Sequence, residues 1–181
     1  MKQTILFLAF MTLIGSVYAQ KKTTTSATIA FDASTSLDNL PKAENKTAIA
    51  AFDAKTGIVQ FEASVKNFAF NNPMMQQHFN SDKWLNSDLY PKFSFKGAIA
   101  DLSKLNTTKD GVYNVSVKGD LTIKDITKPV TAPATITVKS GVVSTATNFS
   151  INLADYDITG APIEAGKVAK EPKITVSAEF K

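Results

Sequence analysis

The chain has 181 residues, with 20 basic and 16 acidic side chains, one histidine and a net charge of +4 at pH 7. Every basic residue is a lysine, and the lysines are scattered among the acids, which argues against a nucleic-acid partner. Cysteine is absent, so disulfides and cysteine-ligated metals cannot hold the fold together.

Residues 1–19 have the pattern of a cleavable signal peptide. Lys2 precedes an apolar run over residues 5–14, and Val17-Tyr18-Ala19 forms a small-residue cleavage site ahead of Gln20. The apolar run is too short to cross a bilayer, for which about twenty residues are needed, and no cysteine follows it for a lipid anchor. We expect a periplasmic or secreted protein, processed after Ala19, with no stable membrane anchor.

The rest of the chain alternates apolar and polar residues with the period of β-strands. Gly-containing turns at residues 53–57, 109–111 and 139–141 separate the alternating segments. Pro129 and Pro133 push one strand toward an edge or a bulge. The predicted strands are centred on residues 27–31, 49–52, 59–65, 93–97, 113–123, 134–138, 149–153 and 174–180.

Helical periodicity is confined to two short candidates, residues 73–79 and residues 81–85. Pro73 suits the first turn of the former. Roughly eight strands at hairpin-like spacing, with no linker, predict one all-β domain at residues 20–181, either an antiparallel β-barrel or a sandwich.

Eight aromatic residues fall between Phe61 and Phe95, where the first helical candidate leads into a strand. Such a cluster either fills a closed core or lines an apolar cavity, and residue types alone leave both open. His78 has no second histidine or cysteine to complete a metal site, so we expect no metal there. No nucleophile motif or phosphate loop is present, so we expect no enzymatic activity.

Three blocks of sequence resemble the YceI-like family of exported lipid- or polyisoprenoid-binding proteins. The first covers residues 75–80 and 85–97, where a leucine, an acidic residue and a Tyr-Pro pair precede a strand with alternating Phe93 and Phe95. The second is residues 117–130, and the third is residues 149–158. The resemblance implies a lipocalin-like barrel whose apolar cavity holds a polyisoprenoid or fatty-acyl lipid, with no other cofactor.

Strand parity and position near the helical segment identify the candidate ligand-binding residues. The expected cavity residues are Phe61, Met74, Met75, Phe79, Trp84, Leu85, Tyr90, Phe93, Phe95, Val115, Val117, Leu121 and Phe149. The candidates for a lipid headgroup or the cavity mouth are His78, Asn80 and Asp88.

Two other functions remain open from the sequence. One is a structural or interaction domain with a closed core, and the other is a hydrolase-type enzyme centred on His78 and nearby carboxylates. Pairing of free edge strands between two copies offers one route to a homodimer.

Export gives a direct test. We expect protein recovered from its native host to begin at Gln20, because the signal pattern ends at Ala19. N-terminal sequencing that finds Met1 on that protein would contradict this prediction.

Overall fold

The computed structural model describes residues 21–180, so the predicted signal peptide lies outside the described residues. Within that range the chain is mostly β-strand, with two short α-helices and three 3₁₀ turns. The strands are β1 (Lys21–Asp32), β2 (Lys42–Asp53), β3 (Ile58–Ser64), β4 (Ala69–Phe70), β5 (Lys92–Ile99), β6 (Gly111–Ile123), β7 (Ile126–Lys139), β8 (Val142–Ser150) and β9 (Lys173–Phe180). The helical elements are η1 (Val65–Asn67), α1 (Pro73–Asn80), η2 (Leu102–Lys104), η3 (Leu153–Tyr156) and α2 (Ala161–Glu164).

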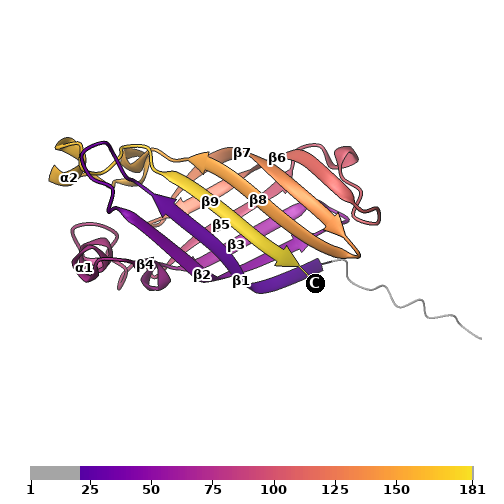
Figure 1. Cartoon of the computed structure of the whole chain (residues 1–181), viewed down its shortest axis with the longest axis horizontal. Coiled ribbons are helices and arrows are strands. Elements are labelled where there is room, and N and C mark those ends of the chain that lie inside the picture. The colour runs from indigo at the N-terminus through magenta and orange to yellow at the C-terminus, as the bar shows by residue number, and fades with distance from the viewer. Residues whose placement is uncertain (1–20, 181) are drawn as a thin grey trace, which may run out of the picture.

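The sheet closes on itself and forms an elongated antiparallel barrel (Figure 1). Its strand order is β1-β9-β8-β7-β6-β5-β3-β2, and β1 also pairs with β2 to complete the ring. The two-residue β4 is an extra strand on the edge of β2. Of the two architectures expected from the sequence, the barrel is confirmed. Closure pairs β1 with β2, the two strands at the ends of this order. The homodimer through paired edge strands remains a prediction.

The alternation in sequence determines which side chains enter the barrel. On β6, Val115 and Ile123 are buried, whereas Asn114, Lys118 and Asp120 on the opposite face are exposed. The pleat sends successive side chains to opposite faces, so each strand contributes one apolar row to a shared interior.

The predicted turns at residues 53–57 and 139–141 are present. In the first, the Asp53 carboxylate accepts hydrogen bonds from the backbone N–H groups of Lys55 and Thr56, and Gly57 has a φ of 72°. A two-residue turn that also joins β6 to β7 places both Lys124 and Asp125 in the left-handed region. Such turns match the twist of the strands that they connect.

Three local expectations change or gain detail. Residues 81–85 form turns rather than a helix. β8 begins at Val142 and ends at Ser150, so the strand that the sequence had suggested at residues 149–153 was placed too late along the chain. The strand stops because the Asn152 side chain accepts a hydrogen bond from the Ala154 N–H and caps a 3₁₀ turn. β7 pairs with β8 only from Ala134 onward, so its proline-containing first half is an edge on that side, as the prolines indicated.

A pair of glycines brings β5 and β6 unusually close together inside the barrel. Gly97 lies directly opposite Gly119, and the Phe95 ring lies over both. A Cβ added to Gly119 would be 2.4 Å from the Gly97 Cα and 2.5 Å from the Lys96 carbonyl oxygen. Both contacts are to backbone, so the strands would have to separate to admit even a methyl group.

This packing predicts that Gly119→Ala lowers the free energy of unfolding by roughly 2–3 kcal/mol, because the added methyl group forces the two strands apart. Urea denaturation measures the change. Gly111→Ala is the matched control, since its Cβ would meet only the Tyr113 ring, at 3.3 Å, and we expect it to cost less than about 1 kcal/mol. Equal stability of the two variants would contradict the account of the glycine pair.

Candidate functional site

The barrel encloses an apolar cavity with a volume of about 140 Å³. Thirty residues line it, drawn from every strand of the closed ring, from α1 and the segment after it, from the residue before β4 and from the segment after β8. Only Ser94, Thr145 and Thr147 among them carry a polar side chain, and none carries a charge. The Thr147 hydroxyl already donates to the Pro133 carbonyl, at 2.6 Å. Such a wall offers burial to hydrocarbon and almost no hydrogen bonding.

The cavity is narrow for the number of side chains that form it. A dry apolar cavity of similar volume can hold a molecule the size of benzene, and a compact void of that size touches far fewer than thirty residues. Four successive inward positions of β8, from Val143 to Phe149, line it, so the space is drawn out along the barrel. This shape suits an extended hydrocarbon chain better than a compact ring or a peptide.

One end of the barrel is covered by α1 and by the loops beside it (Figure 1). Phe79 of α1 is buried and lies within 4.9–6.1 Å, between ring centroids, of Phe31, Phe68 and Phe70. These aromatic contacts fix the helix by its inner face. Phe79, Trp84 and Leu85 all line the cavity, so this segment forms its cover.

Polar contacts fix the position of α1 as firmly as the aromatic ones. Asn72 caps its N-terminus by accepting from the backbone N–H groups of Met74 and Met75, and Pro73 occupies the first turn as expected. The Gln76 side chain accepts from the Phe70 N–H, at 3.1 Å, which ties the helix to β4. The helix therefore sits over the barrel in one rotational setting.

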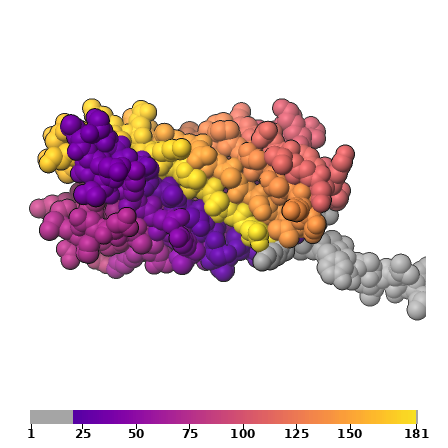
Figure 2. All heavy atoms as spheres, viewed as in Figure 1, coloured from indigo at the N-terminus to yellow at the C-terminus, as the bar shows by residue number. Residues whose placement is uncertain are grey.

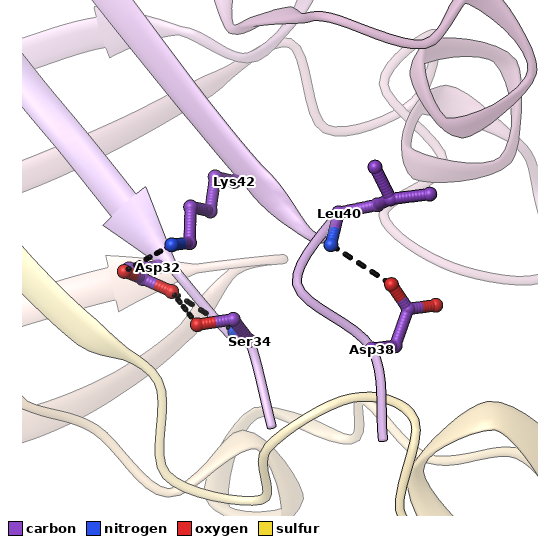
Figure 3. A network of polar contacts seen from close by, with 5 residues as sticks. All are labelled: Asp32, Ser34, Asp38, Leu40 and Lys42. Carbon is purple, nitrogen blue, oxygen red and sulfur yellow. Dashed lines mark hydrogen bonds and ion pairs between the residues drawn. The ribbon is translucent and has the colours of Figure 1, made fainter. Parts of the chain in front are cut away.

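The loop between β1 and β2 borders the same end and is ordered by its own side chains (Figure 3). The Asp32 carboxylate accepts from both the N–H and the hydroxyl of Ser34 and pairs with Lys42 at 3.5 Å. Partial burial raises the pKa of the Asp32 carboxyl, but the Ser34 hydrogen bonds and the Lys42 charge outweigh it, so the pKa lies below its usual value. The carboxylate is thus ionised at neutral pH, and the loop keeps this anchor.

The structure brings nine of the thirteen expected cavity residues together on the wall: Phe61, Phe79, Trp84, Leu85, Phe93, Phe95, Val117, Leu121 and Phe149. The other four do not line it. Met74 and Met75 are on the outward and lateral faces of α1, because the Phe79 anchor sets the helix rotation. Tyr90 lies in the turn before β5, and Val115 is buried in the core without reaching the cavity.

The three candidate headgroup residues also lie off the cavity wall. His78 is exposed on the last turn of α1, and Asp88 is exposed and paired with Lys66 at 2.5 Å. Asn80 donates from its side chain to the Gln76 carbonyl, while its Oδ1 is buried without a hydrogen-bond partner. The chemistry of the cavity therefore rests on apolar contacts.

Several cavity residues were missed by sequence reasoning. They come from β7, β8 and β9 above all, and include Ile136, Val143, Ile174, Val176 and Phe180. The alternation that predicted β7 and β9 already assigned their side chains to one face, so strand parity alone could have found those of these two strands.

A buried tyrosine lies close to the cavity without lining it. Burial, together with the neighbouring Asp155 charge, raises the pKa of Tyr156 to about 12. The phenol therefore stays neutral at physiological pH and adds no charge to this end of the barrel.

Neither a metal site nor a membrane-crossing helix is found within residues 21–180. No group of three or more His, Asp or Glu side chains there could hold a metal ion. No helix in the same range is long and apolar enough to cross a bilayer.

Solved structures with the same barrel are known from several bacteria. Burkholderia cenocepacia BcnA shares 23% identity and a TM-score of 0.68, over 86% of this chain and 96% of its own. A polyisoprenoid-binding domain from Saccharophagus degradans shares 12% identity and a TM-score of 0.74, over 90% and 98% of the two chains. A Campylobacter jejuni YceI protein shares 16% identity and a TM-score of 0.54, over 100% and 99%. At these identities the likeness shows a common fold.

No curated protein matches the sequence significantly. The model of the YceI-like domain, however, matches residues 11–180, nearly the whole chain. Two of the three sequence blocks that suggested this family, the first through its residues 85–97 and the second at residues 117–130, lie side by side on β5 and β6 and meet at the glycine pair. This protein belongs to the YceI-like family.

Proposed function

We propose that this protein is an exported carrier that holds the hydrocarbon chain of an isoprenoid, or of a similar lipid, inside its barrel. The observation that carries the proposal is the cavity wall, in which 27 of thirty residues are apolar and none is charged. One structural relative is a polyisoprenoid-binding domain, which supports the same ligand class. The signal-peptide pattern of residues 1–19 supports export.

Burial alone can supply useful affinity. Each CH₂ group moved from water into an apolar site contributes about 0.8 kcal/mol, so ten such groups contribute roughly 8 kcal/mol before the entropy of association is subtracted. Micromolar binding needs about 8 kcal/mol net, so the ligand must bury more than ten such groups to offset the entropy of association as well. No specific headgroup contact is needed, which agrees with the position of His78, Asn80 and Asp88 off the wall.

The narrow cavity also limits which part of the ligand can lie inside the barrel. A volume of about 140 Å³ is small for a long chain, so we expect side chains to move aside or part of the chain to extend through the covered end. A charged headgroup finds no partner on the wall, so it stays outside, in water. The ligand is therefore bound by its tail.

A homologous series of prenyl alcohols tests the proposal. We expect geraniol, farnesol and geranylgeraniol to raise the melting temperature in increasing order, because each added prenyl unit buries more apolar surface. The same ligands should change the fluorescence of Trp84, which lines the cavity. Absence of any thermal shift with all three alcohols and with long-chain fatty acids would contradict the carrier function.

A pair of variants on one strand separates binding from folding. Val117 lines the cavity on β6, whereas Val112 on the same strand is 65% exposed. Val117→Trp should weaken the apparent affinity for farnesol, measured from the thermal shift, at least about tenfold, because the indole occupies the cavity. Val112→Trp should bind like the unmodified protein. Since both variants add an indole, native mass spectrometry and thermal shift replace fluorescence here. Equal affinity of the two variants would place the ligand outside the barrel.

A further inference from the structure

Large apolar side chains project into solvent at the covered end of the barrel. Leu37 is 72% exposed, Met74 and Leu89 are each 63% exposed, and Leu40 is 56% exposed. They account for four of the seven exposed large hydrophobic residues in the described part of the chain. The other three, Ile49, Ile58 and Val112, lie on the strands.

The four residues come from separate segments that meet at this end. Leu37 and Leu40 are on the loop between β1 and β2, Met74 is in the first turn of α1, and Leu89 is in the turn before β5. In Figure 2 the loop and the segment around α1 lie at the same end of the elongated molecule, the loop in its upper half and the α1 segment in its lower half. We call these four side chains the apolar tips.

Each tip has its backbone N–H already satisfied within its own turn. The N–H of Leu37 donates to the Thr35 hydroxyl, and that of Leu40 donates to the Asp38 carboxylate (Figure 3). The N–H of Met74 donates to the Asn72 side chain, and that of Leu89 donates to the Asn86 carbonyl. A backbone N–H that enters a lipid phase without a partner costs several kcal/mol, and none of these four would incur that cost.

Charges of both signs lie next to the tips. The Asp32–Lys42 pair flanks the loop that carries Leu40, and the Lys66–Asp88 pair lies beside Leu89. Asp38, between the two leucines of the loop, and the exposed Asp82 and Lys83 after α1 add further charges of both signs, none of them ion-paired within the described residues. A surface that carries both signs without a cluster of lysines complements zwitterionic lipid headgroups, which also present both signs. It has little attraction for a strongly anionic bilayer, which would call for a cluster of unpaired lysines.

We propose that the covered end of the barrel docks reversibly on a zwitterionic lipid surface, with the apolar tips inserted among the headgroups. The proposal rests on the proposed function, because it places the end of the cavity covered by α1 against the phase from which a lipid chain would be loaded. Insertion of four aliphatic side chains gives transient attachment rather than a permanent anchor. A protein partner is less suited to this surface, because interface hot spots favour Trp, Tyr and Arg, whereas the tips are aliphatic and the chain has no arginine.

Vesicle flotation tests the proposal with protein that starts at Gln20, which keeps every described strand. The probe is a phosphatidylcholine vesicle free of isoprenoids. We expect the protein to float with the vesicles, with little change between low and high salt because charges of both signs give little net attraction to screen. The fourfold variant Leu37→Ser, Leu40→Ser, Met74→Ser and Leu89→Ser should lower the partition coefficient at least about hundredfold.

The matched control removes the three exposed aliphatic residues of the strands. Ile49→Ser, Ile58→Ser and Val112→Ser together should leave vesicle binding within about twofold of the unmodified protein. Both variants must melt as folded proteins and show the same thermal shift with farnesol. Docking fails if the unmodified protein does not float, if it floats only with anionic vesicles, or if the control loses as much binding as the fourfold variant. It fails as well if sedimentation shows a dimer that only the fourfold variant dissociates, since the tips then join two copies.

The two proposals fail separately. Thermal shift with farnesol but no flotation overturns docking and leaves the carrier function intact. Flotation without any thermal shift overturns the carrier function and leaves a lipid-surface protein.

Discussion

Closure of the sheet by β1 and β2 is the constraint on which the rest of this structure depends. Once these strands pair, the ring has no unpaired terminal strand, and one row of side chains from every strand must share a single interior. The seam is closed by small residues, since Ala27 and Ala48 face each other there, fully buried, beside a shift in register. Eight strands give an interior only wide enough to be filled by side chains or to hold one slender ligand. Here the rows leave a narrow space, and its wall carries no charge.

The glycine pair determines much of the shape of that space. A side chain at Gly97 or Gly119 would collide with the backbone of the opposite strand. β5 and β6 can therefore approach closely only because neither position carries a side chain. The Phe95 ring lies over the pair and becomes part of the cavity wall. A small backbone requirement thus positions a large apolar side chain at the site. Both glycines belong to sequence blocks that resemble the family, residues 85–97 and residues 117–130.

The sequence predicted the strands well where apolar and polar residues alternate in size and polarity, as in β3, β6 and β9. It predicted the extents of β1 and β2 less well, because threonine and alanine dominate both strands and give little contrast between the two faces. Parity also placed Val115 and Val117 on the same inward face, but it could not tell that only Val117 reaches the cavity. The rotation of α1 was equally hidden, since it depends on the contacts of Phe79 with three other rings, and it turned Met74 and His78 outward. Distances between elements, rather than patterns within them, decided these outcomes.

We propose that the barrel carries a lipid chain in its interior. Native mass spectrometry of the protein purified from its own host without detergent tests this most directly. We expect a bound species whose extracted mass and fragmentation identify a lipid with a long isoprenoid or acyl chain, and we expect Val117→Trp protein from the same host to carry much less of it. Protein that arrives free of lipid, and that takes up none when mixed with host lipid extract, would rule out the carrier function and favour a closed β-domain with a side-chain core.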